Sequence, residues 1–198
     1  MINLLPEPKR LVEKGGFTGV FREIFLEFEK GEEELLELAR LRFWNYPELA
    51  LIQEEKEEAF RLCARRSLEG IETEKPKLFR EQGYDLEINE TEAVLRFEDR
   101  AGFINGVTSL KQILSAEEKG FRLPLCHITD YPALPVRAIA QTFSWYAGYG
   151  RFGFDSQLWG YEDWVQYLNI CLDNKINQFN LVMYGYWPFD LPGHPETV

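Results

Sequence analysis

The stretch Tyr84–Ala116 reads YDLEINETEAVLRFEDRAGFINGVTSLKQILSA and holds the clearest structural signals of the chain. In its first half, residues 84–88 and 93–97 alternate apolar and polar side chains on either side of the polar link 89–92. Alternation with a period of two, interrupted by a short polar link, predicts a β-hairpin that has one polar face.

The second half of this stretch has the period of a helix. Apolar side chains recur every three or four positions over 101–116, and Asp99 or Arg100 is expected near the start of the helix. A second helix is predicted over 32–44, where three glutamates precede a run of leucines. Strands that pack beneath two such helices indicate an α+β domain.

Two further N-terminal segments give weaker signals. Residues 16–28 are rich in strand-forming side chains and predict a strand or a bent pair of strands, which Gly31 ends. Residues 49–68 fit a helical face and a strand equally well, so periodicity leaves both possibilities open there.

The C-terminal part has a different pattern. Residues 136–140 predict a short apolar strand, 161–175 an amphipathic helix closed by Asn174, and 179–184 a second strand. A strand, a helix and a strand in this order form one βαβ unit of a parallel sheet or barrel. Since a complete (β/α)₈ barrel needs about 250 residues, we expect this part to be the beginning of an incomplete, truncated barrel.

The domain boundary is predicted from the prolines and the composition. Residues 130–135 contain two prolines that bar a helix, as in a connector between domains. The segment 143–189 holds 15 of the 29 aromatic residues, whereas only 8 of the 55 charged residues lie from position 143 onward. We therefore expect an α+β domain over 1–129 and the start of a barrel over 130–198.

The net charge of −11 restricts the partners of the protein. A surface this acidic repels the phosphate backbone of nucleic acids and anionic membranes, so neither is expected as a partner. The chain has no run of 18 apolar residues, which predicts no membrane span. We expect a cytoplasmic protein, or a secreted one if a leader has been removed.

The cysteines and histidines give no sign of a metal or a disulfide framework. Cys63, Cys126 and Cys171 are odd in number and widely spaced, which favours three buried free thiols. His127 and His194 stand far apart without a ligand cluster, so no metal is expected.

No cofactor is expected either. A GxGxxG pattern occurs at 148–153, but residues 154–160 separate it from the next helix. In a dinucleotide-binding fold the helix would begin at once and place its N-terminus on the phosphate. A barrel loop is therefore the preferred interpretation of this pattern.

Several of these segments resemble glycoside hydrolase family 20. The run DRAGFINGVTSLKQIL at 99–114 is similar to the "AG-FYG-QTL-QLL" segment of the N-terminal domain of that family. Residues 128–132 and 135–138 look like its "I-D-P-RG" connector into the first barrel strand, and 172–179 like its "MA-KLNVF" segment. The glycine after the connector arginine is here Ala138, and the Ser-Arg-His stretch that follows in the family is absent.

The resemblance implies a zincin-like α+β domain followed by the first strand, helix and second strand of a catalytic (β/α)₈ barrel. It also implies hydrolysis of terminal N-acetylhexosamine by an Asp-Glu pair after the fourth barrel strand, with the substrate's own acetamido group as nucleophile. The chain alone is therefore expected to hold no catalytic residue and to be inactive. Related α-N-acetylglucosaminidases or α-glucuronidases, and a stand-alone interaction domain, are the alternatives.

Arg137 is the first candidate for substrate binding. A guanidinium on an otherwise apolar strand needs partners, and its fork can donate to two sugar hydroxyls at once. The resemblance implies that this arginine holds hydroxyls of the terminal sugar. A structural salt bridge with Asp130 or Asp163 is the alternative role.

Aromatic residues after the predicted strands form the second candidate group. Trp145, Tyr186 and Trp187 follow strands, where barrel sites lie, and their rings are suited to stacking on a sugar. Asp190 is the one acid well placed on the same functional side. A carbohydrate is thus the expected partner, and exposed edges of a partial barrel predict a possible homo-oligomer.

Overall fold

The computed structural model describes residues 2–46, 49–144 and 159–184. The chain forms two compact units, one from residues 1–135 together with 173–175, the other from 136–172 and 176–198. In the described part of the chain no helix is both long and apolar enough to cross a membrane.

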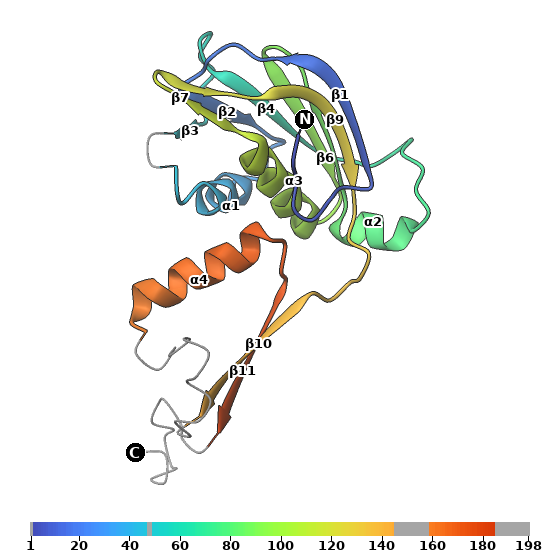
Figure 1. The fold of residues 1–198 in the computed structure, drawn as a ribbon. Helices are drawn as coiled ribbons and strands as arrows, with labels where there is room; N and C mark the ends of the chain where they lie inside the picture. Colours follow the sequence, from blue (N-terminus) through green and yellow to red (C-terminus); the bar gives the residue numbers. More distant parts are fainter. Residues whose placement is uncertain (1, 47–48, 145–158, 185–198) are drawn as a thin grey trace. The chain divides into compact units, whose positions relative to one another are not determined.

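A seven-stranded sheet is the centre of the first unit, with the strand order β1-β9-β5-β6-β4-β2-β3 (Figure 1). Its strands are β1 (Arg10–Phe17), β2 (Glu23–Glu27), β3 (Ala50–Ile52), β4 (Phe60–Arg66), β5 (Tyr84–Ile88), β6 (Glu92–Phe97) and β9 (Pro124–Asp130). A separate two-stranded sheet contains β7 (Ser115–Glu117) and β8 (Gly120–Arg122).

The pairing confirms the predicted hairpin. β5 and β6 are antiparallel, with Leu86 opposite Leu95. The bent pair predicted over 16–28 corresponds to the end of β1 and to β2, and the ambiguous segment 49–68 contains the strands β3 and β4. β9, which the sequence analysis missed, lies antiparallel between β1 and β5.

Two amphipathic helices cover one face of this sheet, as predicted (Figure 1). They are α1 (Glu34–Arg42) and α3 (Arg100–Ile113). Asp99 caps α3 because its carboxylate accepts a hydrogen bond from the backbone N–H of Ala101 at 3.2 Å. A third, short helix, α2 (Pro76–Gln82), precedes β5.

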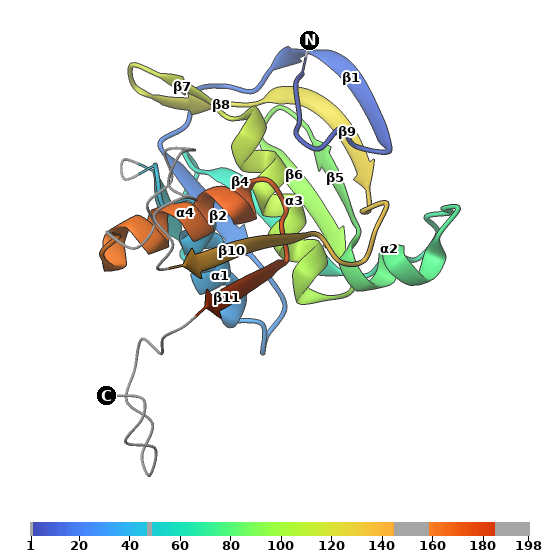
Figure 2. The same ribbon diagram turned by 60° about the horizontal axis from the view of Figure 1, so that its bottom comes forward.

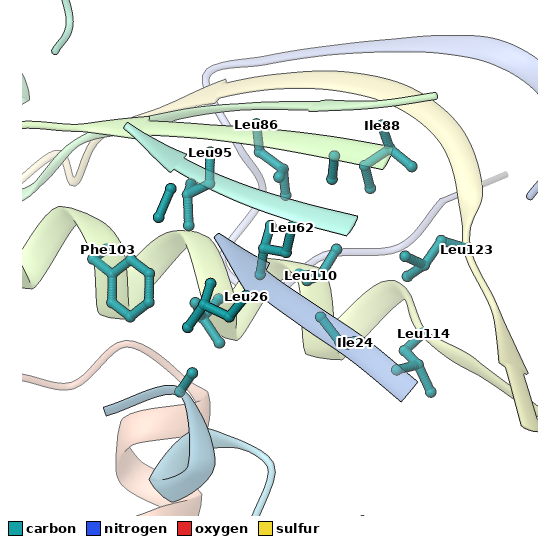
Figure 3. Close-up of a cluster of buried hydrophobic side chains, with 14 of the residues drawn as sticks. Ile24, Leu26, Leu62, Leu86, Ile88, Leu95, Phe103, Leu110, Leu114 and Leu123 are labelled. Carbon is teal, nitrogen blue, oxygen red and sulfur yellow. The ribbon is translucent and has the colours of Figure 1, made fainter. Parts of the chain in front are cut away.

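The hydrophobic core lies between the sheet and these helices (Figure 3). Its side chains come from the inward-facing positions of the strands, from α3 and its C-cap, and from the link between β8 and β9: Ile24, Leu26, Leu62, Leu86, Ile88, Leu95, Phe103, Leu110, Leu114 and Leu123. At about 25 cal/mol per Å² of apolar surface removed from water, this burial is the main stabilising contribution of the unit.

Two glycines allow α3 to approach the sheet closely. A Cβ atom on Gly102 would lie 2.3 Å from the carbonyl oxygen of Gly83, and one on Gly106 would lie 2.3 Å from Cδ1 of Leu95. The glycines of the AGFING segment therefore set the distance between helix and sheet.

The second unit contains β10 (Ala138–Ser144), α4 (Tyr161–Asp173) and β11 (Gln178–Tyr184). β10 and β11 pair in parallel, from Ala138 opposite Gln178 to Ser144 opposite Tyr184 (Figure 2). The strand, helix and strand agree with the predicted βαβ unit, while its continuation into a barrel stays a prediction. The left-handed residue after α4 is Lys175, with a φ of 57°, one position beyond the predicted Asn174.

Candidate functional site

Only one of the five predicted substrate-binding residues belongs to the described part of the chain. Trp145, Tyr186, Trp187 and Asp190 lie outside the described residues, as does the GxGxxG pattern at 148–153. Arg137 is described and stands immediately before β10.

The backbone of Arg137 is fixed at the beginning of the parallel strand pair. Its N–H donates to Oδ1 of Asn177 at 2.8 Å, and its carbonyl accepts from the N–H groups of Asn177 and Gln178 at 3.0 and 3.2 Å. Arg137 thus lies at the amino ends of both strands. Sites of parallel barrels form at the carboxyl ends instead, so this position favours the structural role for Arg137.

The two acids named as possible partners of Arg137 have other contacts. The carboxylate of Asp163 accepts a hydrogen bond from the N–H of Gly160 at 2.9 Å, in front of α4. Asp130 forms a 2.9 Å ion pair with Lys175. The substrate-binding role of Arg137 stays a prediction.

A buried polar cluster surrounds Asp130 on the inner face of the sheet, and we call it the Asp130 cluster: Tyr84, Ser109, Asp130 and Lys175. The ammonium of Lys175 lies 2.9 Å from Oδ2 of Asp130 and donates to the hydroxyl of Tyr84 at 3.2 Å. That hydroxyl lies 2.6 Å from Oγ of Ser109 on α3. The cluster therefore joins β5, β9, α3 and the turn 173–175, all within the first unit.

Burial determines the electrostatics of this cluster. Tyr84 is 1% exposed, and burial together with the negative charge of Asp130 raises the pKa of its hydroxyl well above the ordinary value. The phenol therefore stays protonated and acts as a hydrogen-bonding group. The side chains of Asp130 and Lys175 are 8% and 4% exposed, which leaves no open position for a ligand.

Asp173, in the same turn, is held by a second group of cations. Its carboxylate lies 2.7 Å from the ammonium of Lys111 and 3.6 Å from the guanidinium of Arg42. Burial lowers the pKa of Lys111 and of Arg42, while the charge of Asp173 opposes the shift in both. Like the Asp130 cluster, this group binds the turn 173–175 within the first unit.

The outer face of the sheet carries a different group, the Asp85 cluster: Asp85, Arg96, His127 and Thr129. Oδ1 of Asp85 accepts a hydrogen bond from the hydroxyl of Thr129 at 2.7 Å and lies 2.8 Å from Nε2 of His127. Oδ2 lies 3.8 Å from the guanidinium of Arg96. Asp85 is 3% exposed, yet it lines a pocket of the outer face together with its three partners.

The thiols are not suited to nucleophilic chemistry. Burial, reinforced by the negative charge of Glu27, raises the pKa of Cys63 to about 11, and burial raises the pKa of Cys126 to about 11. A thiolate is the reactive form of cysteine, so both side chains are unreactive near neutral pH. Among the described residues, no group of three or more His, Cys, Asp or Glu side chains could hold a metal ion.

Sequence reasoning missed both polar clusters. The alternation of the predicted hairpin assigns Tyr84 and Asp85 to opposite faces of the sheet, so the sequence could have predicted different surroundings for these two residues. The partners of these residues come from β9 and from the turn after α4. No element was predicted over 124–129, directly before the predicted connector 130–135, so β9 was not recognised. Without that strand, Asp130 and His127 could not be placed opposite β5.

Comparisons with known proteins agree with this fold. The sequence model of glycosyl hydrolase family 20, domain 2, matches residues 1–131. A β-N-acetylhexosaminidase from Bacteroides fragilis is similar in structure, with a TM-score of 0.62 and 19% identity over 90% of this chain and 32% of that one. An inactive mutant of a family 20 exo-β-N-acetylglucosaminidase from Vibrio harveyi has a TM-score of 0.68 and 16% identity, over 98% of this chain and 28% of that one.

A third similar structure is the family 20 β-N-acetylhexosaminidase from Streptomyces coelicolor, with a TM-score of 0.63 and 16% identity over 90% of this chain and 34% of that one. The chain thus spans about a third of the length of the solved structures it matches. Identities this low establish a shared fold, whereas the match to the sequence model covers well over half of the 198 residues. The chain belongs to glycosyl hydrolase family 20, as a glycoside-hydrolase-like N-terminal portion whose residues 1–131 match domain 2 of that family.

Proposed function

We propose that this chain is the non-catalytic N-terminal portion of a β-N-acetylhexosaminidase that releases terminal N-acetylhexosamine residues. The observation that carries the proposal is the order of two structures along the chain. A family 20 domain 2 over 1–131 is followed directly by a parallel strand, helix and strand over 138–184. We assign residues 1–129 to the supporting domain and 130–198 to the beginning of the catalytic barrel.

The carboxyl ends of β10 and β11 are the proposed substrate side of that barrel. Ser144 and Tyr184, the last residues of the two strands, lie opposite each other. In the sequence, Trp145 follows the first strand, and Tyr186, Trp187 and Asp190 follow the second. Aromatic rings stack on the C–H face of a sugar, and a carboxylate accepts from its hydroxyls, so this set of residue types supports a role in carbohydrate contact.

The catalytic pair is proposed to lie beyond these two strands. Family 20 chemistry needs an Asp-Glu pair after the fourth barrel strand, and we assign only the parallel strands β10 and β11 of the described residues to the barrel. The 198-residue chain by itself is therefore expected not to hydrolyse an aryl N-acetyl-β-glucosaminide.

The natural gene product provides the test of this proposal. A tag inserted at the N-terminus of the gene allows the protein to be purified from its own cells, so that its length and activity can be measured together. We expect a product several hundred residues longer than this chain that hydrolyses 4-nitrophenyl N-acetyl-β-glucosaminide. A natural product of 198 residues without activity would contradict the proposal and support a stand-alone interaction domain.

The same purified protein separates the related enzyme classes. It is assayed with the β-N-acetylglucosaminide, the α-N-acetylglucosaminide and the α-glucuronide of the same phenol. Hydrolysis of the first substrate alone is the expected result. Preferred hydrolysis of either α-glycoside would replace the proposed activity with that of the corresponding related family.

Arg137→Met in the natural enzyme separates the two roles of this arginine. The position at the amino end of β10 and the half-buried side chain lead us to expect a fall in stability of about 1–2 kcal/mol, with unchanged turnover per folded molecule. An unchanged melting temperature together with a loss of about 2–4 kcal/mol in kcat/KM would instead establish sugar binding. Arg122→Met serves as the matched control. That guanidinium pairs with Glu117 on the small β7–β8 sheet of the first unit, outside the proposed barrel, so kcat/KM should stay unchanged.

Association between copies belongs to the same proposal. In the second unit, Tyr161, Ile170 and Leu181 are exposed apolar side chains, at 79%, 48% and 41% of their surface. Light scattering of the 198-residue chain is expected to show oligomers, while a strictly monomeric chain would argue against this interpretation.

A further inference from the structure

The outer face of the sheet carries a pocket of about 630 Å³ that the proposed function does not use. Its lining comes from β1, β5, β6 and β9, from the neighbouring residues Lys9 and Tyr131, and from residues 70–74, which precede α2. All of these residues belong to the matched domain 2. The volume falls in the range of roughly 300–1,000 Å³ that ligand pockets have.

The charges around this pocket are balanced. Lys9, Arg10 and Arg96 supply three positive charges, and Glu72, Glu74 and Asp85 supply three negative ones. An anion that entered would meet the buried carboxylate of Asp85, and a cation would meet the guanidinium of Arg96. A neutral ligand that both donates and accepts hydrogen bonds can use both kinds of group.

The polar groups of the pocket are arranged around Asp85. Oδ1 of Asp85 is occupied by Thr129 and His127, whereas Oδ2 lies 3.8 Å from Arg96, beyond hydrogen-bond distance. The Arg96 side chain is 46% exposed, so its guanidinium can donate to a ligand. The Asp85 side chain is only 4% exposed, so its carboxylate holds its partners in place, whereas the His127 ring is 31% exposed and faces the same pocket. A guanidinium that donates and an imidazole that can donate or accept suit neighbouring hydroxyls, because each hydroxyl donates and accepts.

Two further residues of the lining support a polar ligand with an apolar part. The hydroxyl of Thr73 is buried and has no hydrogen-bond partner within the described part of the chain. Tyr131 and Ile71 add apolar surface to the same pocket. A sugar ring combines adjacent hydroxyls with C–H patches and therefore fits this lining.

We infer that the outer-face pocket around Asp85 and Arg96 binds a neutral saccharide. This inference goes beyond the proposed function, because it concerns residues of domain 2 and requires no hydrolysis. It assigns to the domain a sugar-binding role of its own.

A titration of the isotopically labelled 198-residue chain tests the inference by NMR. The probes are N,N′-diacetylchitobiose and cellobiose as neutral saccharides, with glucuronic acid as a charged comparison. We expect saturable shifts with at least one neutral probe, centred on the amides of Thr73, Asp85 and Thr129.

Two matched variants identify the site. Arg96→Met removes the exposed guanidinium and is expected to weaken binding about tenfold. Arg61→Met, on the neighbouring strand β4, removes a guanidinium that is 38% exposed and does not line the pocket, and it should leave binding unchanged. Thr73→Val is a second, nearly isosteric variant, expected to weaken binding while the protein keeps its stability.

Four outcomes would overturn the inference. The first three are no saturable shift with either neutral probe at 20 mM, equal loss of binding in both arginine variants, and binding of glucuronic acid alone. Shifts confined to the ends of β10 and β11 would also overturn it, and that result would leave the proposed hexosaminidase function in place. Conversely, an inactive natural enzyme would remove the proposed function without affecting the titration.

Discussion

The two faces of one strand pair carry two buried carboxylates with opposite surroundings. Tyr84 pairs with Asp130 in the register of β5 and β9, and the next pair is Asp85 with Thr129. Because successive residues of a strand point to opposite faces, Asp130 faces the helices and Asp85 the outer surface. Asp130 is enclosed by an ammonium and a phenol, whereas Asp85 borders a pocket.

The two surroundings predict different effects of substitution on the two faces of the sheet. A buried ion pair with all partners in place stabilises one arrangement of the chain and excludes ligands. The partners of Asp85 are more exposed, at 46% for the Arg96 side chain and 31% for His127, so their hydrogen-bonding groups remain accessible from the pocket. Substitutions on the inner face should therefore change stability strongly, and those on the outer face should change it weakly.

The largest effect is expected for Lys175→Met. The variant keeps most of the volume and the left-handed backbone of residue 175, but it leaves the carboxylate of Asp130 without its cation. Removing one partner of a buried pair costs roughly 3–5 kcal/mol. The free energy of unfolding, measured with urea and circular dichroism, should fall by that amount.

Lys77→Met is the control for this experiment. Lys77 is 90% exposed and forms a loose 3.7 Å pair with Glu81, so its loss should change stability by less than about 0.5 kcal/mol. If both lysine variants were equally stable, the Asp130 cluster would not be the structural element that the comparison requires.

The next effect concerns the helix that holds the inner face in place. In Gly102→Ala the new Cβ would meet the carbonyl oxygen of Gly83, directly before β5, at 2.3 Å. Overpacking of this kind costs about 1–3 kcal/mol, which exceeds the gain of up to ~1 kcal/mol in helix propensity. We expect urea denaturation to show a less stable protein, whereas Gly19→Ala, with its nearest neighbours at 3.5 Å and beyond, should be close to neutral.

Much of this fold could be predicted from the sequence where local signals were strong. The hairpin 84–97 and the helix after Asp99 combine regular alternation, a capping acid and a clear apolar stripe. Residues 49–68 could not be assigned, because β4 is buried on both sides at Leu62, Cys63 and Ala64 and therefore lacks alternation.

The polar clusters depend on contacts that local patterns do not contain. Lys175 meets Asp130 across 45 residues, and His127 meets Asp85 across 42. Such pairs follow from the strand order, in which β9 inserts between β1 and β5. Arg137, by contrast, was chosen as a candidate because it is a charged residue on an apolar strand. Only the register of β10 with β11 shows that it lies at the amino ends of the two strands.

A smaller effect is expected on the outer face, for Thr129→Val. The substitution keeps the shape of the side chain and removes one hydrogen bond to Oδ1 of Asp85, which retains its contact with His127. A loss of about 1–1.5 kcal/mol in the free energy of unfolding is expected. Thr91→Val, in the exposed hairpin link, is the control.

If Thr129→Val lowered the free energy of unfolding as much as Lys175→Met does, both faces of the sheet would be equally important for stability, and the contrast between them would fail.

The smallest effect is a pH dependence on the same outer face. Glu27 on β2 accepts a hydrogen bond from Arg65 on β4, which lowers the pKa of Glu27 below the ordinary 4.5, against the opposing effect of partial burial. A lowered pKa in the folded state means that the pair stabilises the protein fully above about pH 4.5. This contribution is lost as the pH falls through the folded-state value.

Arg65→Met should therefore reduce the loss of stability between pH 5 and pH 3. Arg65 and Glu27 are 38% and 30% exposed, so solvent screening limits the difference to less than about 1 kcal/mol. Urea denaturation at several pH values measures it. Arg22→Met is the control, because Arg22 donates to the carbonyl of Lys119 instead of a carboxylate. If the free energy of unfolding of the wild type and of Arg65→Met changed in parallel with pH, the Glu27–Arg65 pair would be too strongly screened to stabilise the protein.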